Sequence, residues 1–413
     1  MTLRSLLRSM RRCLPGLFRP TGRRSVSRID AGPIVRFMGC DSTQYGSMER
    51  YLVRVAAAVA ARGGSVMVAY DSAPRAAGFV DDLEAAGATL VVTGVPAGYS
   101  WGYFFACYSL LTKWKPGVVH AYFTPGCHVC LAAARLAGVP VRVRTSANMP
   151  LLTQSREHQE SHVFRSALGV RTVMLSRLAQ RILALTPAMR DEFIALGVDP
   201  RRVVVVPGGV DVEHFSPDST GSGVAVRREL GVPDDHIAIG TVSRLVPVKN
   251  LSTWLRAAQR VCATRQDVTF VIVGDGPLRT ELEALAAALG IAGRVVFAGQ
   301  RLDAPAVFAA LDIVGCPSQS EGLSNTVMEA MAMARIVVAS DIPPNADVVD
   351  SGRTGYLVRA DDPASLADGL LEAIASQQDW QAMAAQARQS IVSGHSVQAR
   401  VELELATYAE LCG

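Results

Sequence analysis

Short, nearly continuous apolar runs alternate with longer amphipathic stretches along most of the chain. Such runs are typical of parallel strands covered on both faces, because a strand with one wet face alternates apolar and polar residues. The stretches between them predict helices, such as the alanine-rich one that ends at Arg62. The pattern therefore predicts an α/β fold. The predicted strands are residues 34–38, 65–69, 90–93, 118–121, 140–146, 182–185, 203–206, 237–242, 268–273 and 295–297.

A polar segment divides these strands into two groups. Gly, Pro, Asp, Ser and Thr crowd together in residues 207–222, which indicates a boundary between domains. A chain of 413 residues has room for two to three domains of roughly 150 residues each. A cleft between two such domains is where a ligand of nucleotide size would bind.

Residues 321–329 carry the strongest chemical signal. Glu321 and Glu329 bracket the loop Gly322-Leu323-Ser324-Asn325, which leads into an apolar helical pattern. Ser324 and Asn325 are good N-caps, so Glu321 falls in the loop and Glu329 within the helix. The N–H groups and dipole of that helix favour an anion, most often a phosphate. The two acids suit neutral hydroxyl groups, because a carboxylate only accepts hydrogen bonds.

A second segment, residues 242–250, follows the predicted strand 237–242. Ligands in open α/β sheets bind beyond the carboxyl ends of strands. Arg244 can chelate a phosphate and Lys249 adds a point charge, so together they can neutralise a diphosphate leaving group. Alone, the pair would be read as two solvated surface cations. With the acids downstream, we favour the diphosphate site.

These motifs resemble the retaining glycosyltransferases of family 4 (glycosyl transferases group 1), which have the GT-B fold. The family's E-x7-E motif and the E-A-M-A-x-G-x-P-V-V-A-T run match residues 321–340, with Ala334 and Ile336 replacing the usual Gly and Pro. Its G-R-L-x-x-x-K-G element matches residues 243–250. The resemblance implies two Rossmann-like, doubly wound parallel-sheet domains facing across a cleft. We expect an acceptor-side domain at 29–208, a nucleotide-sugar-binding domain at 209–394 and a last helix, 395–413, that packs back on the first domain.

Weaker motifs extend the resemblance. Gly276 ends a Gly-x-Gly turn after strand 268–273, which in the family lies near the nucleoside, as does the position of Gln300; a plain tight turn explains the glycines equally well. Gly46 and Glu49 match a G-G-x-E element in which Ser47 replaces the second glycine. We assign Gly46 to the diphosphate or acceptor side of the cleft, with an ordinary β-to-α turn as the alternative.

Three positions depart from the family pattern in the first half. Ser146 stands where a T-x-H strand end carries a histidine that faces the sugar, which favours a subgroup with another donor. Tyr122 replaces the second histidine of a D-V-V-H-A-H strand end. His120 of that strand end either points into the cleft or is a hydrogen-bonded histidine. Gly208 replaces the asparagine of a P-N-G-V-D signature at the boundary.

The positive charge is concentrated at one end. Eight arginines precede Asp30, so of 41 basic residues 33 remain against 37 acidic ones, and the rest of the chain is mildly acidic. A nucleic-acid partner is therefore not expected. Residues 1–28 form a basic leader whose first part reads as an amphipathic helix, suited to an anionic membrane surface; a disordered leader or a transit peptide is the alternative. No apolar run reaches the roughly 18 residues that span a bilayer. The apolar side of residues 1–14 holds Leu3, Leu6, Leu7, Met10, Cys13 and Leu14.

Neither a disulfide framework nor a metal site is expected. Eight cysteines in a chain of this length indicate a reducing compartment. Cys127 and Cys130 have the spacing of half a zinc site, but no second pair follows at finger distance, so we favour helix packing. The resemblance likewise implies catalysis without a metal or other cofactor.

The combined interpretation is a retaining glycosyltransferase. It would move a sugar from a UDP- or GDP-sugar to a saccharide or lipid-linked saccharide, in surface polysaccharide or glycolipid synthesis, in the cytoplasm or on the inner face of the cytoplasmic membrane. Arg244, Lys249 and Glu321 are the expected catalytic residues. Two alternatives are a GT-B-like nucleotide-sugar epimerase and a catalytically idle relative. The expected donor-binding residues are Glu329, Gly322, Leu323, Ser324, Asn325, Gly276 and Gly46.

Overall fold

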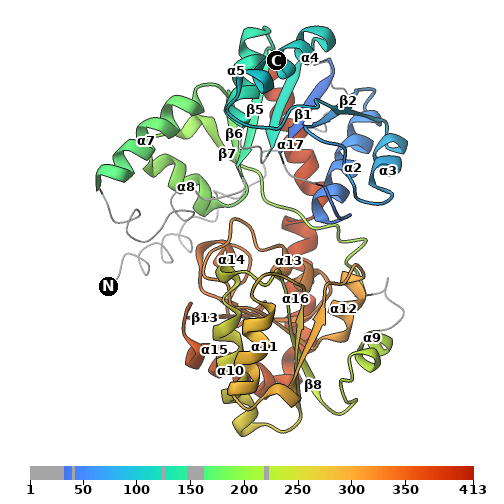
Figure 1. Cartoon of the computed structure of the whole chain (residues 1–413), viewed down its shortest axis with the longest axis vertical. Coiled ribbons are helices and arrows are strands. Elements are labelled where there is room, and N and C mark those ends of the chain that lie inside the picture. The colour runs from blue at the N-terminus through green and yellow to red at the C-terminus, as the bar shows by residue number, and fades with distance from the viewer. Residues whose placement is uncertain (1–31, 40–41, 123–125, 147–161, 218–222) are drawn as a thin grey trace.

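The computed structural model describes residues 32–39, 42–122, 126–146, 162–217 and 223–413. It contains two parallel β-sheets, one above the other in Figure 1, with helices packed against them. The predicted α/β fold with two Rossmann-like domains is confirmed. The leader predicted at residues 1–28 lies outside the described residues.

The first sheet has seven parallel strands in the order β3-β2-β1-β4-β5-β6-β7. Its central strands are buried on both faces and are mostly apolar, with Arg36 of β1 and His120 of β4 as buried polar exceptions. The strands are β1 (Ile34–Met38), β2 (Val66–Tyr70), β3 (Ala88–Val92), β4 (Val118–Tyr122), β5 (Val141–Ser146), β6 (Arg181–Ala184) and β7 (Val203–Val205).

The second sheet has six parallel strands in the order β10-β9-β8-β11-β12-β13. Domain limits at 208 and 394 stay a prediction, although the strands of this sheet fall between them. The strands are β8 (Ile237–Val242), β9 (Val268–Val273), β10 (Val295–Gly299), β11 (Ile313–Cys316), β12 (Ile336–Ser340) and β13 (Tyr356–Val358).

Helices cover both faces of each sheet. In the first domain α2 and α17 share a core with one face, while α4 and α5 cover the other. In the second domain α10 and α15 cover one face, and α13 and α16 the other. The helices are α2 (Ser47–Ala60), α3 (Phe79–Ala85), α4 (Trp101–Trp114), α5 (Cys127–Leu136), α7 (His162–Ser176), α8 (Pro187–Ala195), α9 (Gly223–Glu229), α10 (Leu251–Thr264), α11 (Arg279–Ala288), α12 (Ala304–Ala310), α13 (Asn325–Ala332), α14 (Pro343–Ala346), α15 (Pro363–Ala375), α16 (Trp380–Gly394) and α17 (Val397–Cys412), with single 3-10 turns η1 (Pro200–Arg202), η3 (Pro247–Lys249), η4 (Ala292–Arg294) and η5 (Gln377–Asp379).

The chain crosses between the domains twice, at adjacent points. Val210 donates its N–H to the carbonyl of His395 (2.8 Å), and Val397 donates to the carbonyl of Val210 (2.9 Å). After the second crossing, α17 returns to the first sheet and packs against α2 and β5, as the red helix of Figure 1 shows. Among the described residues, no helix is long and apolar enough to cross a membrane.

Each sheet changes the direction of its strand order once, between β1 and β4 in the first domain and between β8 and β11 in the second. At such a switch point the loops that follow the two strands lead away from each other and leave a crevice, which is where doubly wound sheets bind ligands. The loops after β8 and β11 carry most of the predicted site residues; Gly46 follows β1, and Gly276 follows β9.

Candidate functional site

The loops after β8 and β11 are tied to each other in the second domain. The hydroxyl of Thr326 donates to the carbonyl of Val242 at the end of β8 (2.8 Å). The N–H of Gln319 donates to the carbonyl of Val248 (3.0 Å). These bonds bring the motif around Arg244 and the acid-pair loop to one edge of the sheet.

Lys249 and Glu321 form an ion pair. The ammonium nitrogen of Lys249 lies 2.6 Å from Oε1 of Glu321, and both side chains are largely buried. The hydroxyl of Ser318 donates to the same Oε1 (2.7 Å). Within the described residues Oε2 of Glu321 accepts no hydrogen bond, so it is available to a ligand hydroxyl.

Asp361 holds the two loops in place, although nothing in the sequence signals it. One of its carboxylate oxygens accepts from Asn250 (2.8 Å) and from Gln319 (2.7 Å). Asn250 itself has a left-handed backbone (φ 53°), which lets helix α10 start directly after η3. Asp361 and Ser318 are therefore supporting residues that the motifs alone did not identify.

Arg244 is exposed and its side chain forms no hydrogen bond or ion pair with any described residue. Its loop is nevertheless fixed, because Leu245 donates to the carbonyl of Asp275 (2.9 Å) and accepts from Leu278 (3.2 Å). A Cβ on Gly276 would lie 2.6 Å from the carbonyl oxygen of Leu245. A side chain at position 276 would therefore collide with the loop that carries Arg244, and this contact explains the glycine.

Helix α13 begins without a side-chain cap in this part of the structure. The predicted cap Ser324 occupies the N-cap position, but its hydroxyl lies 3.4 Å from the thiol of Cys316 and does not cap the helix. Asn325 is exposed and Gly322 is partly exposed. The first turn of α13 therefore presents N–H groups that suit an anion.

The side chain of Leu323 points toward the first domain and not toward the anion site at the start of α13. Its side chain packs with the cluster around β6 and α8, and a Cβ on Gly208 would lie 2.0 Å from one of its methyl groups. The glycine that replaces the family's asparagine therefore makes room for Leu323. Only the backbone of Leu323 is left to face a ligand.

Glu329 connects the two domains. The hydroxyl of Ser47, in the first turn of α2, donates to Oε1 of Glu329 (2.6 Å). Burial raises the pKa of Glu329 to about 7, and the Ser47 hydroxyl and the Arg50 charge oppose that rise. Gly46, the N-cap of α2, donates to Glu49 within a capping box. The structure thus brings the Gly46 loop and the acid pair together across the domains.

A cavity of about 1050 Å³ lies beside this contact, between the two domains. Its wall comes from the start of α2, from the first crossing segment and from the loop after β10. Gln300 lines it, whereas Arg244, Lys249 and the two acids do not. Its size suits a nucleotide-sized ligand. The segment after β2 and helix α3 contribute Arg75, Ala77 and Asp82 to the wall, and the other lining residues include Gln44, Tyr45, Arg50, Asp211, His214 and Leu302.

His120 does not face this cavity. It is fully buried, with Nδ1 2.6 Å from the Tyr408 hydroxyl and Nε2 2.7 Å from Oγ1 of Thr145. Burial lowers its pKa to about 4, against the opposing effect of Glu404. Of the two interpretations of His120, the structure favours the hydrogen-bonded histidine.

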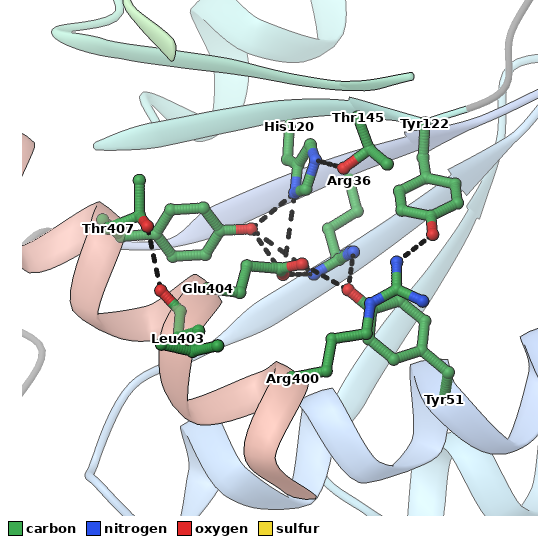
Figure 2. A network of polar contacts seen from close by, with 10 residues as sticks. Arg36, Tyr51, His120, Tyr122, Thr145, Arg400, Leu403, Glu404 and Thr407 are labelled. Carbon is green, nitrogen blue, oxygen red and sulfur yellow. Dashed lines mark hydrogen bonds and ion pairs between the residues drawn. The ribbon is translucent and has the colours of Figure 1, made fainter. Parts of the chain in front are cut away.

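His120 belongs to a buried polar network that joins α17 to the first sheet (Figure 2). Glu404 accepts from Arg36, Tyr51 and Tyr408. Arg400, on the same helix, donates to Tyr122. Although burial favours the neutral acid, the Arg36 charge holds the pKa of Glu404 well below its ordinary value. Tyr122 thus fixes the C-terminal helix from the position where the family has a second histidine.

The described residues contain no group of three or more His, Cys, Asp and Glu side chains that could hold a metal ion. Cys127 and Cys130 are buried in the core beneath α4 and α5. The thiol of Cys130 donates to the carbonyl of Cys127 (3.1 Å). Both cysteines therefore pack within the helix.

Two family models match the chain. The model described as Glycosyltransferase Family 4 matches residues 48–214, and the one described as Glycosyl transferases group 1 matches residues 225–390. Between them they span most of both domains.

Curated relatives include an Escherichia coli UDP-Gal:alpha-D-GlcNAc-diphosphoundecaprenol alpha-1,3-galactosyltransferase. It is 28% identical over 303 residues, which is 71% of this chain and 76% of the relative. A D-inositol 3-phosphate glycosyltransferase of Stackebrandtia nassauensis is 36% identical over 184 residues, or 42% of this chain and 41% of the relative. The match to the second relative thus spans less than half of either protein.

Solved structures share the whole two-domain arrangement. Anabaena HepE in complex with UDP has a TM-score of 0.75 and 22% identity, covering 92% of this chain and 100% of that one. WaaG, a glycosyltransferase involved in lipopolysaccharide biosynthesis, has a TM-score of 0.68 and 16% identity, covering 91% and 99%. At these identities the likeness establishes the fold, and the predicted GT-B architecture is confirmed.

Proposed function

The chain belongs to family 4 of the glycosyltransferases, and we propose that it transfers a glycosyl group from a nucleotide-sugar to a saccharide or lipid-linked saccharide with retention of configuration. The observation that carries the proposal is the convergence of three features at the β8–β11 switch point. These are Arg244, whose side chain has no partner among the described residues, the Lys249–Glu321 pair and the start of α13, which has no side-chain cap. A diphosphate fits such a site because it carries negative charge and several acceptor oxygens.

The donor is a UDP-hexose in the first instance. The Escherichia coli relative is named for UDP-galactose, and HepE structures contain UDP and UDP-glucose. A GDP-hexose is the second donor to test. The same relative is named for a lipid-linked acceptor, which supports a role in surface polysaccharide or glycolipid synthesis at the inner face of the cytoplasmic membrane.

Bond cleavage leaves both bonding electrons on the diphosphate oxygen. Arg244, Lys249 and the N–H groups of residues 322–325 stabilise the charge that develops there. Glu329 accepts from the ribose hydroxyls, and the free Oε2 of Glu321 accepts from a sugar hydroxyl. The acceptor oxygen then bonds to the anomeric carbon from the face that the diphosphate leaves, and its proton passes to the departing phosphate. Attack from that face retains configuration.

Donor binding tests the proposal directly. Purified protein is heated with a panel of UDP- and GDP-sugars, and the true donor raises the melting temperature by mass action. An Arg256→Ala variant, which removes an exposed arginine from α10, should respond like the wild type. A panel in which no nucleotide-sugar stabilises the protein, or a UDP-soaked crystal with an unoccupied β8–β11 crevice, would overturn the proposal.

A further inference from the structure

The β1–β4 switch point of the first domain has its own cluster of polar side chains, which surrounds the cation Arg144. His128 lies in the first turn of α5, directly after the loop that follows β4. Arg144 lies near the carboxyl end of the neighbouring strand β5, in register with Ala121 of β4. By the topological argument used for the second domain, this is where the first domain would contact a ligand.

The contacts within the cluster are specific. Nη1 of Arg144 lies 3.2 Å from Nε2 of His128. The hydroxyl of Tyr99 lies 3.4 Å from Nδ1 of the same ring. The guanidinium of Arg144 also stands 6.0 Å from the ring centre of Phe193. His128 thus accepts from one edge of Arg144, and the other N–H donors of this guanidinium have no hydrogen-bond partner among the described residues.

The positive charge of Arg144 has no counter-charge among the described residues. Burial, together with the charges of Arg144 and Arg171, lowers the pKa of His128 to about 3, so the ring is neutral. Arg144 forms no ion pair with a carboxylate of the described residues. Arg54, Arg62 and Arg181 of the same domain each form one. A partly buried guanidinium without a counter-charge is costly unless a ligand supplies one.

We propose that Arg144 and the His128–Tyr99 pair bind the phosphate group of a phosphorylated acceptor saccharide. The guanidinium of Arg144 carries the charge opposite to that of a phosphate, and its fork matches the phosphate oxygens. The site belongs to the first domain, which is the acceptor side of the proposed transfer. This assignment rests on the proposed glycosyl transfer and adds the chemical class of the acceptor.

Calorimetric titration with UDP at saturation tests the site, because UDP keeps the donor crevice occupied. The probes are N-acetylglucosamine 1-phosphate and unphosphorylated N-acetylglucosamine. The wild type should bind the phosphorylated probe at least about tenfold more tightly, and Arg144→Gln should lose about tenfold. Arg135→Gln, which removes an exposed arginine from the other end of α5, should bind like the wild type. Equal affinity for both probes, or full binding by Arg144→Gln, would overturn the assignment.

Two further titrations distinguish failure of the proposed function from failure of the phosphate site, and a lipid-linked acceptor from a soluble one. If UDP does not bind the wild type, the proposed function fails, while titration of the phosphorylated probe without UDP still tests the anion site. A second probe, N-acetylglucosamine linked through diphosphate to a farnesyl chain, distinguishes a lipid-linked acceptor from a soluble sugar phosphate. Tighter binding of the farnesyl form, lost in Arg144→Gln, would identify the lipid-linked source. If Arg135→Gln lost as much affinity for the phosphorylated probe as Arg144→Gln, general surface charge would explain the binding and the site would be refuted.

Discussion

The hydroxyl oxygen of Ser47 lies 2.6 Å from Oε1 of Glu329, and this hydrogen bond links two domains across 282 positions of sequence. Ser47 occupies the position of the second glycine in the G-G-x-E element that this loop resembles, and a glycine there would have no hydroxyl to donate. Together with the packing of Leu323 against Gly208, it holds the acid pair against the first domain. Rotation of the domains away from each other must break both contacts.

The pKa of Glu329 predicts a pH-dependent stability. Its folded value of about 7 lies above the ordinary value of about 4, so the folded state binds the proton more tightly. Stability therefore falls as pH rises from about 4.5 to about 7 and is constant above that. Glu329→Gln should remove this loss of stability. In urea unfolding, the free energy of unfolding of the variant minus that of the wild type should therefore increase between about pH 4.5 and about pH 7, by up to about 3 kcal/mol. A difference that is the same at every pH would contradict the assignment.

Arg244→Ala should lower glycosyl transfer by about two orders of magnitude or more, because it removes a cation that acts on the developing charge of the leaving group. The side chain is exposed and unpaired within the described structure, so the unfolding midpoint should not change. The measurement is nucleotide release with a saturating donor. Arg256→Ala is the control, and normal turnover in Arg244→Ala would refute the leaving-group role.

Gly46→Ala tests whether a ligand approaches the α2 loop. The nearest protein atom to an added Cβ is Oε2 of Glu49 at 3.4 Å, and φ is −101°, so the folded state should tolerate alanine. If the diphosphate contacts this backbone, kcat/KM for the donor should fall about tenfold. Gly293→Ala, where an added Cβ meets nothing within 4 Å, is the matched control. Unchanged kinetics in Gly46→Ala would favour an ordinary turn.

Ala334→Gly should stabilise the protein. Ala334 has φ of 53°, a left-handed conformation that costs a non-glycine residue roughly 1 kcal/mol. It stands where the family usually has glycine, so the substitution should raise the free energy of unfolding by about 0.5–1 kcal/mol. Ala287→Gly, on the exposed side of helix α11, should lower it by about 1 kcal/mol. Loss of stability in both variants would show that Ala334 is not strained.

Glu404→Gln should destabilise the first domain by roughly 3–5 kcal/mol, because it leaves Arg36 buried without its carboxylate. The lowered pKa of Glu404 means that the contribution of the carboxylate is present above about pH 4 and is lost on acidification. Chemical unfolding with fluorescence detection measures the cost. Glu402→Gln, which removes an exposed partner of Arg62 from the same helix, should cost less than about 1 kcal/mol. Similar costs in the two variants would contradict the importance of burial.

The sequence predicted the sheets well where strands are long and buried on both faces. The runs 237–242 and 268–273 coincide with β8 and β9, because most residues of these strands are apolar. The strands β11, β12 and β13 were not among the predicted strands. β11 and β12 each follow an apolar helical stretch, and a short apolar run cannot be distinguished from a buried helix segment by its periodicity. The three residues of β13 are too few to give a periodic signal.

The motifs located the loops of the site but not the contacts within it. Lys249 and Glu321 were assigned to diphosphate and sugar, and their mutual ion pair follows only from the register of β8 and β11. The Ser47–Glu329 bond depends on the relative orientation of two domains, which no local pattern encodes. The same holds for Leu323, whose side chain contacts the first domain.

Synthesis on the ribosome delivers Arg36 long before Glu404, since 368 positions separate them. Until α17 has been synthesised, the guanidinium of Arg36 in β1 lacks the carboxylate that it pairs with in the folded core. The first domain therefore cannot complete its core before the end of translation, although it is translated first.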